Sequence, residues 1–128
     1  MADEINYFPT LETERLILHQ LLREDTDFVF QHFSNLAVTE YSQTEEIVQF
    51  YAEPMEKTHN RWILLRKSDQ QPIGTVGYHK WVKRYFRAEI GYDLSPDFWG
   101  QGHMSEALRV VLSHGFKRMG VNRVDALV

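Results

Sequence analysis

The chain of 128 residues contains no cysteine. Disulfide frameworks, thiolate metal sites and cysteine nucleophiles are therefore excluded. No apolar run approaches the roughly 18–20 residues that a membrane-spanning helix needs. The N-terminal residues Met1–Ile5 also lack the basic and apolar regions of a secretory signal. These absences predict a cytoplasmic protein with no membrane partner.

The sequence also has no excess of basic residues. It contains 14 Lys and Arg against 18 Asp and Glu, a formal net charge of −4. Binding a nucleic-acid backbone needs a concentrated basic face, so we expect no nucleic acid as partner. One basic cluster is present, and we interpret it as a solvated strand and turn: Lys80, Lys83, Arg84 and Arg87. Without a repeat or a linker, residues 1–128 are expected to form a single domain.

Hydrophobic periodicity divides the first two thirds of the chain into helices and strands. A strand is predicted within Thr13–Leu22. Two helices follow, and their apolar stripes are Val29, Phe33 and Leu36, then Ile47, Tyr51 and Met55. Three runs joined by short turns then predict an antiparallel meander: Arg61–Arg66, Ile73–Trp81 and Arg87–Leu94. Glycines inside these runs indicate bulges or close approach of another group, at Gly74, Gly77 and Gly91.

The last third contains the clearest predicted helix. Apolar residues recur at spacings of three and four from Met104 to Met119, and Glu106 is expected on the opposite, polar side. Gly120 stands where a helix-ending glycine belongs. Arg123–Val128 then has the pattern of a strand.

A glycine-rich turn leads directly into this helix, in the stretch Trp99-Gly-Gln-Gly-His-Met-Ser-Glu-Ala107. Such a turn directs several free amide groups and the positive end of the helix dipole at one point, which binds phosphate. The two glycines alone are equally consistent with a tight turn that has no ligand.

Four stretches, taken in chain order, resemble the GNAT superfamily of acetyl-CoA-dependent N-acetyltransferases, and more narrowly its ribosomal-protein N-acetyltransferase branch. They are Leu11–Leu18, Pro72–Gly77, Ala88–Leu94 and Trp99–Ala107. The resemblance implies an α/β fold of the α+β type, a mixed, mostly antiparallel central sheet flanked by helices. Family members normally continue with another helix and two strands, so the expected fold is C-terminally short. The strand edge left at Val124, Leu127 and Val128 then favours a homo-oligomer.

The resemblance also implies which residues bind acetyl-CoA. Backbone amides in the turn would hold the pyrophosphate of coenzyme A, namely Gln101, Gly102, His103, Met104 and Ser105. The exposed backbone of a preceding strand would pair with the pantetheine arm, at Tyr92, Asp93 and Leu94. The sequence departs from the family pattern at His19, Trp99 and Met104, but none of these changes removes a backbone amide.

Glu89 is the candidate general base for a direct attack of an amine on the thioester. It lies in the Ala-Glu-Ile-Gly-Tyr segment, where this branch of the family has a Glu proposed for that role. The alternative is a surface carboxylate paired with Arg87 or Lys83. Asp93 is a weaker second candidate for the base.

The free energy needed to neutralise the acceptor favours a weakly basic amine. Neutralising an α-amine at pH 7 costs roughly 1–1.4 kcal/mol, whereas a lysine side chain costs about 4.6 kcal/mol. We therefore expect a protein N-terminus or a small amine as acceptor. No metal is expected, because no histidine pair has zinc-like spacing. His32, His59 and His114 are expected on the surface, and His79 is either an ordinary strand residue or a neighbour of the acceptor site.

Two other functions are compatible with parts of the sequence. The first is a non-catalytic domain that binds coenzyme A or another protein. The second is a dinucleotide-binding module, since Gly100, Gly102 and Ser105 half-match its fingerprint and Asp125 is suitably placed for a ribose. The antiparallel strands before the turn argue against a dinucleotide-binding module.

Overall fold

The computed structural model describes residues 7–35, 41–52 and 58–126. Its core element is one six-stranded sheet in which every strand pairs with its neighbours in chain order. All neighbours are antiparallel except the last two, which are parallel. The strands are β1 (Leu11–Glu12), β2 (Leu16–Gln20), β3 (Trp62–Arg66), β4 (Gln71–Val82), β5 (Arg87–Leu94) and β6 (Arg123–Ala126). This mixed, mostly antiparallel sheet confirms the predicted fold class.

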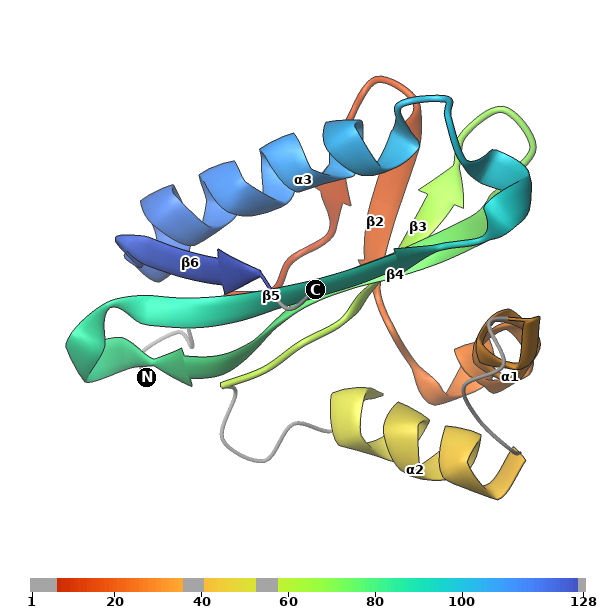
Figure 1. Ribbon diagram of the computed structural model, residues 1–128, viewed down its shortest axis with the longest axis horizontal. Helices are drawn as coiled ribbons and strands as arrows, with labels where there is room; N and C mark the ends of the chain where they lie inside the picture. The colour runs from red at the N-terminus through yellow and green to blue at the C-terminus, as the bar shows by residue number, and fades with distance from the viewer. Residues whose placement is uncertain (1–6, 36–40, 53–57, 127–128) are drawn as a thin grey trace, which may run out of the picture.

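Helices cover both faces of the sheet (Figure 1). Helix α3 (His103–His114) packs on one face, and α1 (Thr26–Asn35) and α2 (Tyr41–Ala52) lie on the other. The turn between β5 and α3 returns the chain to the α3 side before β6 pairs with β5 (Figure 1). The two faces of β5 therefore belong to different layers of the molecule.

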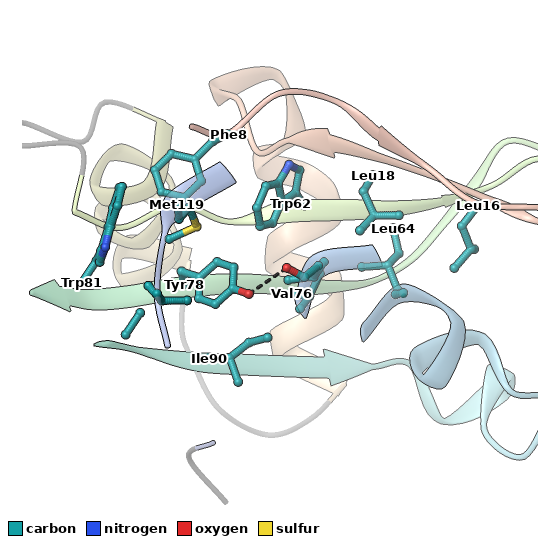
Figure 2. Packing of buried hydrophobic residues seen from close by; sticks show 14 of the residues in the cluster. Phe8, Leu16, Leu18, Trp62, Leu64, Val76, Tyr78, Trp81, Ile90 and Met119 are labelled. Atoms are coloured by element: carbon teal, nitrogen blue, oxygen red, sulfur yellow. Dashed lines mark hydrogen bonds between the residues drawn. The ribbon is translucent and has the colours of Figure 1, made fainter. Parts of the chain in front are cut away.

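The larger hydrophobic core lies between the sheet and α3. Trp62, Val76 and Tyr78 are fully buried there, and Figure 2 shows them packed with Phe8, Leu18 and other apolar side chains. The Tyr78 hydroxyl donates a hydrogen bond of 2.7 Å to the Val111 carbonyl of α3. Burial raises the pKa of Tyr78 above its usual value, so this hydroxyl stays a donor. A smaller cluster holds α1 and α2 on the opposite face: Leu21, Val29, Val48 and Ile63.

The predicted elements are found, with shifted ends. The first predicted strand is confined to Leu16–Gln20, and α3 continues as a single π-helical turn over Gly115–Met119. Gly120 ends that turn with a φ of +75°, as the pattern predicted. Four predicted apolar positions lie outside the described residues: Leu36, Met55, Leu127 and Val128.

Three side chains predicted on the surface are inside instead. His32 and His114 are buried, because His32 binds a carboxylate of the sheet and His114 binds the Tyr7 carbonyl. Glu106 is half-buried, because Thr13 and Arg15 bind its carboxylate. In each case a long-range hydrogen bond supplies a partner that helical periodicity cannot reveal.

Strands β5 and β6 pair over only part of their length. The parallel register runs from Arg87 and Arg123 to Ile90 and Ala126. Within the part of the chain that the structure describes, no strand covers the outer edge of β5 beyond Ile90. Within the described residues, the backbone groups on this side of its carboxyl end therefore have no strand partner.

Candidate functional site

A cavity of about 510 Å³ lies at the amino end of α3. Its lining combines the carboxyl end of β5 with the glycine-rich turn and the first residues of α3. The lining residues are Tyr92, Asp93, Leu94, Trp99, Gly100, Gly102, His103, Met104 and Ser105. The structure thus brings together, around one hollow, every residue predicted to bind the cofactor except Gln101.

The turn adopts a conformation that favours glycine and exposes amides. Gly100 and Gly102 have φ angles of +77° and +80°, which L-residues rarely adopt. The first helical hydrogen bond runs from the Glu106 amide to the Gly102 carbonyl, at 3.1 Å. The amides of the first three helical residues therefore precede the helix's own hydrogen-bond ladder, at the positive end of its dipole. This arrangement suits a phosphate.

Arg15 and Glu106 join this turn to the beginning of β2. Arg15 Nε donates to Glu106 Oε1 at 2.7 Å, and Arg15 Nη1 donates to the Gln101 carbonyl at 3.0 Å. The Thr13 hydroxyl also donates to Glu106 Oε2. Burial opposes the ionisation of Glu106, but these hydrogen bonds outweigh it and lower the pKa of Glu106 to about 2. The Thr-Glu-Arg segment near the start of the chain thus fixes the turn.

The residues that depart from the family pattern have structural partners. The Trp99 indole donates to the Leu94 carbonyl at 2.8 Å, which ties the turn to the end of β5. Met104 packs against the larger core while it lines the cavity. The His103 ring is buried beside Phe98, and burial lowers the pKa of His103, so this ring adds no positive charge to the cavity.

On the opposite face of the sheet, Asn60 and Arg61 pack against two glycines. Gly77 and Gly91 are paired in register on β4 and β5. A Cβ at Gly77 would collide with the Asn60 carbonyl oxygen, and one at Gly91 would lie 3.1 Å from Arg61 Nη1. Gly77 therefore leaves room for the backbone at Asn60 and Gly91 for the Arg61 guanidinium, which confirms the close approach predicted from the sequence.

The carboxylate of Asp93 is occupied by three donors. Arg61 Nη2 and the Thr75 hydroxyl each donate to Oδ2 at 2.8 Å, and His32 Nε2 of α1 donates to Oδ1. Burial opposes ionisation of Asp93, but the His32 hydrogen bond and the Arg61 charge outweigh it and lower the pKa of Asp93. A carboxylate with this pKa and these partners holds α1 to the sheet and is a poor proton acceptor.

Glu89 lies on the same face as Asp93, one residue before the last described position at which β6 pairs with β5. Its neighbours are His79 Nε2 at 3.4 Å and Lys80 Nζ at 3.8 Å. The alternative of a carboxylate paired with Arg87 or Lys83 is therefore wrong in its partners, which come from the opposing strand β4. Glu89 Oε2 is buried and accepts no hydrogen bond from the described part of the chain.

Sequence reasoning missed two groups of contacts, the one between Arg15 and Glu106 and the one between Arg61 and Asp93. It singled out the Leu11–Leu18 stretch without a role for Arg15, and it gave Arg61 no role at all. The glycine at position 91 indicated the close approach of another group, but no feature of the sequence identified Arg61 as that group. Pairing across three strands needs the register, which only the fold supplies.

The described ranges contain no cluster of three or more His, Cys, Asp or Glu side chains arranged to hold a metal ion. Among the same residues, no helix combines the length and the apolar character needed to cross a membrane.

Comparison with known proteins places this arrangement in a family. The model of the acetyltransferase (GNAT) domain matches residues 15–128. An uncharacterised N-acetyltransferase of Bacillus subtilis (strain 168), YoaA, is 39% identical, over 94% of this chain and 74% of its own length. A second, p20 of Bacillus licheniformis, is 36% identical, over 93% of this chain and 72% of its own.

Solved structures share the fold at lower identity. RimL, a ribosomal-protein alpha-N-acetyltransferase solved in complex with coenzyme A, superposes with a TM-score of 0.80 at 19% identity, over 90% of this chain and 72% of its own. A GNAT-family acetyltransferase from Bacillus anthracis gives a TM-score of 0.75 at 22% identity, over 91% and 72%. The family model, the relatives and the fold agree, and the chain belongs to the GNAT acetyltransferase family.

Proposed function

We propose that this protein transfers an acetyl group from acetyl-CoA to a primary amine, either a protein N-terminal α-amine or a small amine. The observation that carries the proposal is the cavity at the amino end of α3, where amides of the glycine-rich turn lie beside the part of β5 that no described strand covers. The N-acetyltransferase names of the relatives support the reaction, and the coenzyme A bound by RimL supports the cofactor.

The residues that would hold coenzyme A fit its chemistry. Amides of the turn and of the first turn of α3 would bind the pyrophosphate: Gln101, Gly102, His103, Met104 and Ser105. The edge of β5 at Tyr92, Asp93 and Leu94 would bind the pantetheine arm as an added strand. The Leu94 carbonyl already accepts a hydrogen bond from the Trp99 indole. The pantetheine arm would therefore pair with backbone groups of Tyr92 and Asp93. When bound, acetyl-CoA supplies the thioester that the amine attacks.

Glu89 would take the proton that the acceptor ammonium must lose. Glu89 alternates along β5 with Ala88 and Ile90, which pack in the core under α3, so its carboxylate lies on the other face of the sheet. The cavity lies at the amino end of α3. Acceptor and cofactor would thus approach from opposite faces and meet beside the carboxyl half of β5. Asp93 is not assigned this role, because three donors already hold its carboxylate.

We treat residues 1–128 as one functional domain, and we keep the non-catalytic domain as the second reading. Both predict binding of coenzyme A, but only the enzyme releases free thiol in the presence of an amine. The predicted cytoplasmic location and homo-oligomer stay predictions.

The test is release of coenzyme A thiol with a panel of N-terminal peptides and small amines. We expect Glu89→Gln to lower kcat about 100-fold at pH 6.5 and less than about 10-fold at pH 9. At pH 9 most α-amines are already neutral, so they need no base.

Glu12→Gln is the matched control, since Glu12 is an exposed carboxylate of β1 paired with Lys67. Its rate should equal that of the unaltered protein. An equal loss at both pH values in Glu89→Gln would remove Glu89 from the base role. Absence of thiol release with every amine, from a protein that binds acetyl-CoA, would favour the non-catalytic reading.

A further inference from the structure

His79 and Glu89 form an unusual pair across β4 and β5. They are directly opposite each other in the antiparallel register, and His79 Nε2 lies 3.4 Å from Glu89 Oε2. Both atoms are buried, and neither has a hydrogen-bond partner among the described residues. A buried polar atom without a partner costs about 1–3 kcal/mol. The pair therefore contributes little to the stability of the fold, which indicates a role in function.

The pair packs beside Gly91, whose missing side chain leaves room for the His79 ring. A Cβ at Gly91 would lie 3.1 Å from His79 Cε1 and 3.1 Å from Arg61 Nη1. Among the described residues, Gly91 is also the first residue of β5 beyond the stretch paired with β6. The imidazole thus packs against the strand at which, under the proposed function, the amine and the thioester would meet.

The surroundings of His79 keep its ring neutral near pH 7. The groups that act on it are Glu89 from β5, Arg61 before β3, Lys80 of its own strand and His59. Burial is the main cause that lowers the pKa of His79; the Glu89 charge opposes it, and the three other groups add to it. A neutral imidazole has a free nitrogen lone pair that can accept a proton.

We propose that His79 accepts from Glu89 the proton that Glu89 has taken from the attacking amine. This inference rests on the proposed function and extends it. The amine nitrogen forms the new N–C bond as the C–S bond of the thioester breaks. Of the two protons that the ammonium loses, one ends on the thiolate sulfur, and the other passes through Glu89 and His79 to solvent.

The order of basicity suits this direction of transfer. Imidazole is a stronger base than a carboxylate, so a neutral His79 ring can accept a proton that Glu89 has taken. The lowered pKa of His79 lets the ring release that proton to solvent again. His79 acts through Glu89 and is therefore a positioning and relay residue.

The first test is a double-mutant cycle on acetyl transfer. We expect His79→Gln to lower kcat about tenfold at pH 7 and to leave the KM for acetyl-CoA unchanged. In the Glu89→Gln background, the same change should cause no further loss, because the relay no longer receives a proton. His19→Gln on β2 is the control and should have normal kinetics. Losses that multiply in the double variant would overturn the relay.

Chemical rescue separates proton transfer from a structural role. Added imidazole should restore the rate of His79→Ala, whose missing ring leaves room for it, and should not restore Glu89→Gln. A rate for His79→Ala that does not depend on imidazole concentration would contradict the inference.

An NMR titration of His79 makes the outcome independent of finding an acceptor. Glu89→Gln removes the charge that raises the pKa of His79, so that pKa should fall further. An unchanged pKa would overturn the inference even in a protein that acetylates amines. If no amine is acetylated, the proposed function has failed, and the titration still decides whether the two groups are coupled.

Discussion

At the scale of single residues, the chemistry around β5 depends on which carboxylate is already occupied. Asp93 and Glu89 lie four residues apart on the same face of one strand, and the sequence alone made both candidates for the base. The structure gives Asp93 three donors, whereas Glu89 Oε2 accepts no hydrogen bond from the residues described. Strand alternation predicted the shared face, but the donors come from α1, from the residue before β3 and from β4, and could not be found from spacing.

This difference predicts a large stability cost at Asp93. Asp93→Asn leaves the buried Arg61 guanidinium without its countercharge, so we expect the free energy of unfolding to fall by about 3–5 kcal/mol. The matched control is Asp69→Asn, which breaks the exposed pair of Asp69 with Arg66 and should change the free energy of unfolding far less. Urea denaturation of both variants measures the difference. Equal losses would show that the Asp93 network contributes no more than a surface ion pair.

At the scale of elements, the function depends on how β2, β5 and α3 are joined. The bounds of β5 and the start of α3 follow closely from sequence periodicity, and the glycine-rich turn predicted the exposed amides. The attachment of the turn to β2 was not predicted, because Glu106 has the spacing of a solvent-facing helical residue. Only packing of the chain's beginning against α3 turns that position inward, where Thr13 and Arg15 meet it.

The attachment predicts a specific dependence of stability on pH. The pKa of Glu106 is about 2 in the folded protein, against 4.5 ordinarily. Its stabilisation is therefore complete above about pH 4.5 and is lost as the pH falls toward 2. We expect Glu106→Gln to lower the free energy of unfolding at pH 7 by about 2 kcal/mol.

Denaturation in urea at several pH values checks this expectation. The difference in the free energy of unfolding between the unaltered protein and Glu106→Gln should shrink as the pH falls from 4.5 to 2. The control is Asp97→Asn, since Asp97 is an exposed acid near the same turn. A difference that stays constant through this range would mean that the ionised carboxylate does not hold the turn.

At the scale of the whole molecule, the sheet separates the side proposed to bind the cofactor from the side proposed to bind the acceptor. The larger core fixes α3 below the glycine-rich turn, and the smaller cluster holds α1 and α2 on the opposite face of the sheet. The sequence predicted the three-stranded meander and the helices well, because local periodicity and the resemblance to the family both act on contiguous segments. It could not predict which side chains meet on each face of the sheet, because that depends on the register of three neighbouring strands.

The central claim is that the turn before α3 binds the phosphates of acetyl-CoA. Calorimetric titration with acetyl-CoA tests it on the unaltered protein, Gly102→Asp and Gly120→Asp, with NAD as the comparison ligand. Both glycines have similar φ angles, +80° and +75°, so both substitutions carry similar backbone strain, but only Gly102 lines the cavity. The account predicts a Kd of about micromolar size for the unaltered protein and for Gly120→Asp, and affinity lowered about a hundredfold or more in Gly102→Asp. Unchanged affinity in Gly102→Asp would contradict it.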